Sequence, residues 1–197
     1  MSAVFVCWQL RPTRYASSAS GIAGVLAATA SGQKEAFVPA NDVSFTIATE
    51  HRQYPAGERV FVRYEITNSG NGSVYVPREW DVKCPASPHI WAWFENGSGQ
   101  HFIPGYAGDC SASEQTIVER MKREAVLLKS GERLQGHVSM ETSLFGGLEP
   151  GAYRVEAVLY GWNEKDFDEP QRNELKKMPA SFIRGEVPAS TRIILTR

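Results

Sequence analysis

Two cysteines and two histidines have the side chains best suited to metal chemistry in this sequence. Four residues separate Cys84 from His89, and eight separate His101 from Cys110. Two thiolates and two imidazoles could hold zinc in a tetrahedral site if both cysteines were reduced. Structural zinc sites usually contain cysteine pairs at closer spacing. We therefore predict no metal site and no cofactor, and expect the two cysteines to be oxidised instead.

A disulfide between Cys84 and Cys110 would close a loop of about 27 residues and, in the chain-entropy model, stabilise the folded state by about 3–4 kcal/mol. The third cysteine, Cys7, lies in an N-terminal segment that we expect to be removed. Its removal leaves an even pair for an oxidising compartment. Two free thiols are the alternative.

A charged segment at residues 163–179 holds the carboxylates Asp166, Asp168 and Glu169. Hard oxygens at alternate positions suit calcium, but the spacing is not that of an EF-hand loop. Pro170 interrupts the segment, so we expect a solvated loop with at most one helical turn around Leu175. A functional or mobile loop is the alternative, because long loops in compact domains often have a function.

No catalytic motif of known geometry is found in the sequence. It contains no Gly-x-Ser-x-Gly elbow, no His-Glu-x-x-His helix and no phosphate-binding P-loop. The four histidines lie in different turns or strands: His51, His89, His101 and His137. We predict no catalytic residue and expect the protein not to be an enzyme.

Two tryptophans one residue apart, in the run HIWAWF, give the clearest candidate for binding. Strand alternation places Ile90, Ala92 and Phe94 on one face and Trp91 and Trp93 on the other. Both faces are apolar, unlike a strand with one solvated face. The second face is therefore either covered by the loop between the two cysteines or presented to a partner.

Both interpretations of this aromatic group remain open. In the first, Trp91 or Trp93 packs into the core and Phe102 and Tyr106 cover the rest. In the second, Trp91, Trp93 and Tyr106 form an exposed patch, since Trp and Tyr bind sugar rings and peptide surfaces well. Trp80 and Trp162 lie near turns and could extend that patch. We predict binding through Trp80, Trp91, Trp93 and Tyr106.

The elements that would position these residues are strands. Apolar and polar residues alternate along five runs from residue 43 onward: 43–49, 59–67, 133–140, 153–160 and 191–196. Turn residues rich in Gly, Asn and Pro separate them, at 55–58, 68–73, 95–100, 129–132 and 149–152. The pattern predicts an antiparallel sandwich whose strands are hydrophobic on their inner faces.

Residues 111–124 depart from the strand pattern. Ser111 and Glu114 have the spacing of a capping box, and Ile117 and Met121 follow four residues apart. This arrangement predicts a short surface helix or an ordered connection.

Two stretches, YPAGERVFVRYEITNSGNGSVYV and LKSGERLQGHVSM…GLEPGAYRVEAVLYGW, resemble bacterial immunoglobulin-like and fibronectin type III-like sandwich domains. The resemblance covers residues 40–162 and the last strand and names no particular family. It implies an immunoglobulin-like antiparallel sandwich of about seven to nine strands with a short helical or irregular insertion. Pro150 and Gly151 match its turn, and Tyr153 its tyrosine corner, in which the hydroxyl bonds to backbone a few residues upstream.

The N-terminal segment has the order of charges expected of a secretory signal peptide. The first acidic residue is Glu35, Arg11 and Arg14 precede the apolar residues 21–27, and Ala28-Thr29-Ala30 follows. We predict cleavage after Ala30 and a periplasmic or secreted protein. An N-terminal extension or a transit peptide is the alternative. The predicted divisions are a signal peptide at 1–30, a linker at 31–41 and a sandwich domain at 42–197.

The composition narrows the list of partners. The net charge is −1, with 21 Lys and Arg against 22 Asp and Glu, and no basic cluster suggests nucleic acid binding. No apolar run is long enough to span a membrane. We therefore expect an exported, non-catalytic module that binds a protein, with a glycan as the alternative ligand.

Overall fold

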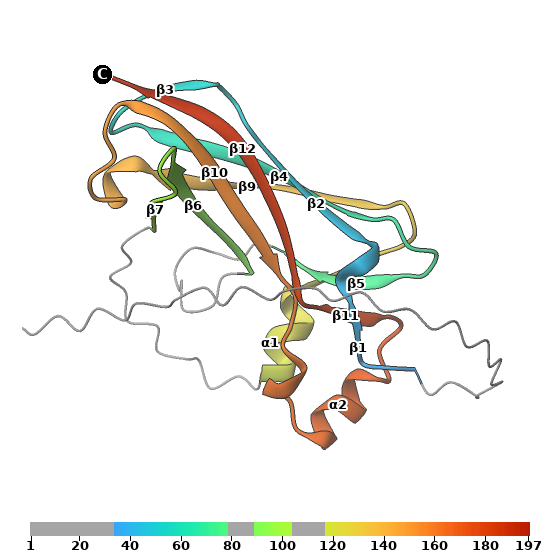
Figure 1. Cartoon of the computed structure of the whole chain (residues 1–197). Helices are drawn as coiled ribbons and strands as arrows, with labels where there is room; N and C mark the ends of the chain where they lie inside the picture. Colours follow the sequence, from blue (N-terminus) through green and yellow to red (C-terminus); the bar gives the residue numbers. More distant parts are fainter. Residues whose placement is uncertain (1–33, 79–88, 104–116) are drawn as a thin grey trace, which may run out of the picture. The chain divides into compact units, whose positions relative to one another are not determined.

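The computed structural model describes residues 34–78, 89–103 and 117–197, and this part of the chain is mostly β-strand (Figure 1). The predicted all-β class is confirmed. The strands are β1 Phe37–Pro39, β2 Val43–Thr49, β3 Gln53–Pro55, β4 Arg59–Asn68, β5 Val74–Pro77, β6 Ile90–Asn96, β7 His101–Phe102, β8 Ala125–Leu128, β9 Arg133–Glu141, β10 Gly151–Tyr160, β11 Ser181–Arg184 and β12 Glu186–Thr196, and the α-helices are α1 Ile117–Glu124 and α2 Glu169–Leu175.

The strands form three sheets. An antiparallel sheet has the order β2-β4-β9, a five-stranded sheet the order β3-β12-β10-β6-β7, and a four-stranded sheet the order β1-β11-β5-β8. Three pairs are parallel, namely β1 with β11, β5 with β11, and β3 with β12. The described strands thus exceed the seven to nine expected and are not all antiparallel. The additional strands β1 and β3 have three residues each, too few for alternation to reveal them.

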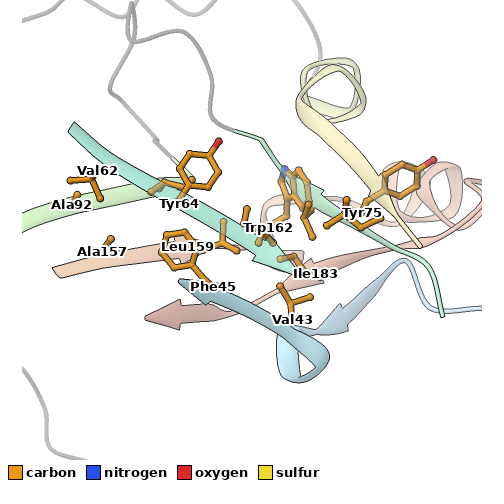
Figure 2. Close-up of a cluster of buried hydrophobic side chains, with 14 of the residues drawn as sticks. Val43, Phe45, Val62, Tyr64, Tyr75, Ala92, Ala157, Leu159, Trp162 and Ile183 are labelled. Carbon is orange, nitrogen blue, oxygen red and sulfur yellow. The ribbon is translucent and has the colours of Figure 1, made fainter. Parts of the chain in front are cut away.

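The predicted alternation is confirmed on the long strands. On β4, Val60, Val62 and Ile66 are fully buried and Tyr64 is 4% exposed, whereas the residues that alternate with them are exposed or half-buried. On β10, Tyr153, Val155, Ala157 and Leu159 are buried on the same side of the strand. Figure 2 shows part of the resulting core, in which side chains of the three-stranded and five-stranded sheets meet.

Gly136 marks a close approach within this core. It pairs with Tyr64 in the β4–β9 register, and a Cβ at position 136 would lie 2.3 Å from the Tyr64 hydroxyl oxygen. Because Gly136 has no side chain, the phenol of Tyr64 can lie across its backbone. Only 4% of the Tyr64 surface is exposed.

The charged segment 163–179 is not a solvated loop. Helix α2 begins after Asp168, whose carboxylate accepts a hydrogen bond from the Gln171 N–H, while the Gln171 side chain accepts from the Asp168 N–H. Pro170 lies in the first turn of the helix, where proline is favoured because its missing N–H would have no partner there. Phe167 and Leu175 are buried, so this segment belongs to the core.

Residues 34–41 are not a linker. Phe37 on β1 is 2% exposed and contacts the rings of Phe167 and Phe182, with ring centroids 5.1 and 6.2 Å apart. Tyr75 and Trp162 pack on Phe182 from other directions, at 4.7 and 5.3 Å. Through this aromatic cluster, β1 packs with the other strands of the four-stranded sheet and with Phe167. The folded domain therefore begins earlier than residue 42.

Helix α1 falls within the predicted segment 111–124. It spans Ile117–Glu124, and Val118 and Met121 on it are buried. The predicted short helix is therefore present, with one side packed against the core and with Lys122 and Arg123 exposed on the surface. Ser111 and Glu114, which were expected to cap it, lie outside the described residues.

Candidate binding face

Strand β6 directs its two tryptophans away from the core. Ile90, Ala92 and Phe94 are buried, at 7%, 8% and 0% exposure. Trp91 and Trp93 alternate with them and are half-buried on the opposite side of the sheet. Neither tryptophan is part of the buried core, so the packing of Trp91 or Trp93 into the core is not observed.

Strand pairing determines the neighbours of these rings. In the β6–β10 register, Trp91 lies opposite Val158, Trp93 opposite Glu156, and Glu95 opposite Arg154. Strand β12 continues the same side beyond β10 (Figure 1). We call this surface the outer face, and its residues are Trp91, Trp93, Glu95, Arg154, Glu156, Val158, Ser190, Arg192 and Ile194.

Charged side chains form a network beside Trp93. Arg154 donates to Glu95 at 2.8 Å and also pairs with Glu156. His101 on β7 contacts Glu95 at 3.2 Å. These four residues therefore connect three adjacent strands of the sheet.

The two carboxyl groups of the network differ in their pKa. The hydrogen bond from Arg154 is the main reason why the pKa of Glu95 lies below its usual value. Burial is the main reason why the pKa of Glu156 is raised, and the nearby charge of Glu95 adds to that effect. Both carboxyl groups lie within a sheet face that also holds the tryptophans.

The indole N–H of Trp93 has no hydrogen-bond partner among residues 34–78, 89–103 and 117–197, although the nitrogen is buried. The ring lies near His101, with centroids 6.0 Å apart and planes tilted by 49°. A buried donor without a partner is unusual and costs about 1–3 kcal/mol.

A hollow of about 750 Å³ adjoins the charged network. Its charged lining consists of Arg52, Arg154 and Arg192 together with Glu95. Ile194, which also lines it, is 44% exposed. The hollow thus combines positive charge with an apolar wall and lies on the same side of the sheet as Trp93.

The other predicted binding residues are not all found here. Trp80 and Tyr106 lie outside the described residues, as do Cys84 and Cys110 with their predicted disulfide. Trp162 is 7% exposed and belongs to the aromatic cluster around Phe182. It therefore does not extend the outer face, contrary to the expectation from its place near a turn.

The predicted corner residues form the expected local contact. The Tyr153 hydroxyl donates to the Glu149 carbonyl at 2.8 Å and accepts from the Glu149 N–H at 3.1 Å. Gly151 begins β10, directly after Pro150. These contacts fix the start of the strand that holds Arg154 and Glu156.

The two histidines of the hypothetical zinc site have different partners. His89 contacts the Tyr160 carbonyl through Nδ1 at 3.0 Å, and its Nε2 lies 3.7 Å from the buried carboxylate of Glu124. His101 contacts Glu95. Within residues 34–78, 89–103 and 117–197, no group of three or more His, Cys, Asp or Glu side chains is arranged to hold a metal ion.

Asp168, one of the three carboxylates considered for calcium, caps helix α2 instead. Neither α-helix in the described part of the chain has the length and apolar character needed to cross a membrane.

Sequence reasoning missed Glu95, Arg192 and the hollow. Arg154 and Glu156 follow from the alternation of their strand, but their position beside Trp93 depends on the pairing of β6 with β10. Opposite charges at Glu95 and Arg154 were the available signal, since such pairs stabilise neighbouring strands. The residue pattern did not reveal which strands are neighbours.

Comparison with known proteins yields no family. No family model and no curated protein matches the chain. Among solved structures, a β-glucosidase from Erythrobacter marinus is 14% identical with a TM-score of 0.39, over 78% of this chain and 15% of its own. The sporulation control protein Spo0M of Bacillus subtilis is 11% identical with a TM-score of 0.39, over 80% of this chain and 50% of its own.

The PapD-like domain 7 of human CEP192 is 11% identical with a TM-score of 0.32, over 91% of this chain and 100% of that domain. The chain thus spans half or less of the length of the first two proteins. Likenesses of this size carry no information on function.

Proposed function

We propose that the chain is an exported, non-catalytic interaction module with an immunoglobulin-like sandwich, which binds a protein partner through the outer face. The observation that carries the proposal is the direction of Trp91 and Trp93. They alternate with buried residues and remain half-buried on the other side of β6, and Trp93 lies opposite Glu156, which pairs with Arg154. A strand needs apolar residues on one side only to pack a core.

The chemistry of the face favours a protein ligand. Binding hot spots are enriched in Trp, Tyr and Arg and are surrounded by residues that exclude water. Trp93 lies beside Arg154, and the hollow contributes Arg52 and Arg192 with the exposed Ile194. Such a surface suits a partner with an apolar side chain flanked by acidic groups.

A glycan is the second candidate. The carboxylates of Glu95 and Glu156 can accept hydrogen bonds from sugar hydroxyls. Aromatic rings on a sheet face also provide a surface on which sugar rings pack.

The test compares matched variants on two faces of the molecule. Trp93→Ala and Arg154→Ala alter the outer face. Phe61→Ala and Arg63→Ala alter the outward side of β4 in the three-stranded sheet, where an aromatic ring and an arginine are likewise exposed. Thermal unfolding first establishes that all four variants fold.

Immobilised protein is then used to isolate a partner, and the purified partner is titrated against each variant. We expect the outer-face variants to weaken binding at least 10-fold and the control variants to leave it unchanged. A glycan array with the same variants tests the second candidate. Equal binding by all four variants, to protein and to glycan, would refute a role for the outer face.

Export rests on the N-terminal sequence. Cleavage after Ala30 would leave every described residue in the mature chain, including Phe37 of the aromatic cluster. Mass spectrometry of the protein recovered from the medium or periplasm should give an N-terminus at Ser31. Recovery of the full-length chain from the cytosol alone would contradict export.

A further inference from the structure

One edge of the three-stranded sheet lacks the features by which proteins protect strand edges. Natural edge strands are kept short or interrupted by Pro, Lys or a bulge. Among the described strands, β1 and β3 have three residues with a proline each, β7 has two, and β8 has four. Strand β2 lies beside β12 (Figure 1). Strand β9 has nine residues, with no Pro and no Lys, and among the strands that the structure describes it pairs with β4 alone.

The inward side of β9 is incompletely covered. Leu134 and Val138 point into the core but are only half-buried. On the adjacent strand β4, Val62 is fully buried and Tyr64 is 4% exposed. Another strand added beyond β9 would cover the apolar side chains that β9 leaves partly in water.

The sequence of β9 is complementary to itself. If two copies pair antiparallel with His137 on the two-fold axis, Arg133 of each copy faces Glu141 of the other, so opposite charges meet at both ends. The remaining opposed residues are Leu134 with Met140, Gln135 with Ser139, and Gly136 with Val138. Each pair joins residues of the same side, so the inward apolar residues stay inward.

The existing ion pairs extend across such an axis. Arg59 already pairs with Glu141, and Glu65 lies 3.3 Å from Arg133. Arg133 of the second copy would therefore approach Glu141, which already pairs with Arg59 of its own copy. Across the joined strands, positive and negative side chains would then alternate. Opposite charges across a strand pair are stabilising, whereas like charges are not.

We propose that β9 is a self-association edge, through which two copies of this chain join their three-stranded sheets into one six-stranded sheet. The axis passes through His137. This inference does not depend on the proposed ligand, because the outer face belongs to the five-stranded sheet.

A cysteine scan tests the register. Directly opposed residues of an antiparallel pair have Cα atoms about 4.5–5.5 Å apart, within the range that a disulfide needs. Copper phenanthroline should therefore cross-link His137→Cys to its copy. Ser139→Cys is the matched control, because its copy would lie four residues along the strand, about 13 Å away.

The native cysteines are accounted for by treating the unsubstituted chain in parallel and by identifying the cross-linked peptides by mass spectrometry. We expect a peptide pair that contains position 137 from both copies, and none for position 139. A cross-link through position 139 but not 137 would overturn the register. Sedimentation would be measured at the highest soluble concentration and after successive 100-fold dilutions. If it found only monomer at every concentration, the proposed association would be wrong.

Charge exchange tests the same axis without cysteine. Arg133→Glu and Glu141→Arg should each weaken self-association at least 10-fold, because each places like charges opposite one another. An equimolar mixture of the two variants should associate again, since all end pairs become opposite in charge. Arg63→Glu, on β4, should leave self-association unchanged. Failure of the mixture to associate, with both variants folded, would contradict the proposed pairing.

Discussion

At the scale of single residues, the buried amide of Asn68 holds three segments together. Its Nδ2 donates to the carbonyls of Gly72 and Leu128 at 2.7 and 3.0 Å, and its Oδ1 accepts from the Gly70 N–H at 3.0 Å. The Gly131 N–H donates to the main-chain carbonyl of Asn68 at 2.7 Å. The turn at 68–73 was predicted from the sequence, but the link to the end of β8 was not, since it depends on chain pairing.

Replacement of Asn68 should therefore be costly. We expect Asn68→Ala to lower the free energy of unfolding by about 3 kcal/mol, because buried carbonyls and an N–H lose their partner. Asn41→Ala, at an exposed position, should change it by less than about 0.5 kcal/mol. Urea denaturation measures both, and equal stabilities for the two variants would contradict the role of Asn68.

The lowered pKa of Glu95 predicts a pH dependence at the outer face. A carboxyl group whose pKa is lower in the folded than in the unfolded state stabilises the fold above the unfolded pKa, near 4.5, and loses that contribution as the pH falls through the folded pKa. Wild-type protein should thus be more stable than Glu95→Gln at pH 7, and the difference should disappear as the pH falls from 4.5 to below the folded pKa.

The urea midpoints of both proteins across this range measure the effect. Glu58→Gln is the matched control, because Glu58 is exposed and, within the described part of the chain, only its main-chain groups have hydrogen-bond partners. A midpoint difference for Glu95→Gln that stayed constant down to pH 2.5 would show that the carboxylate is not the cause.

At the scale of elements, helix α2 is the part of the fold that the sequence least revealed. The capping pair Asp168 and Gln171 and the proline between them are typical helix-start signals. The surrounding charges suggested a solvated loop instead. Phe167 and Leu175 are the buried residues of the segment, and Phe167 contacts Phe37, more than 100 residues away in the chain.

The burial of Leu175 yields a prediction about this helix. Leu175→Ala should lower the free energy of unfolding by about 3 kcal/mol, through lost burial and the cavity that remains. Lys177→Ala, at an exposed position just beyond the helix, should change it by less than about 0.5 kcal/mol. If chemical denaturation found Leu175→Ala as stable as wild type, the segment would be a solvated loop after all.

Long strands were predictable from the sequence, and their partners were not. The inward residues of β4 and β10 follow directly from a period of two. The parallel pairs β1–β11 and β3–β12 join segments far apart in the chain, and each involves a strand of three residues. The outward direction of Trp91 and Trp93 was one of two open interpretations, because alternation separates two faces without saying which is covered.

At the scale of the whole described domain, two different surfaces have separate expected roles. The outer face of the five-stranded sheet combines Trp91 and Trp93 with the network around Arg154. The edge strand β9 belongs to the three-stranded sheet. A partner on the first surface and a second copy on the other could bind at the same time, so ligand binding should be equally strong for wild type and Arg133→Glu.

The most direct measurement of the binding role is residue-resolved hydroxyl-radical footprinting, with and without the isolated partner. Trp91 and Trp93 should be oxidised several-fold faster than the buried Trp162 in the free protein, and the partner should protect them while Phe61 remains unchanged. If Trp91 and Trp93 react as slowly as Trp162 in the free protein, or if the partner protects Phe61 instead, the outer face is not the binding surface.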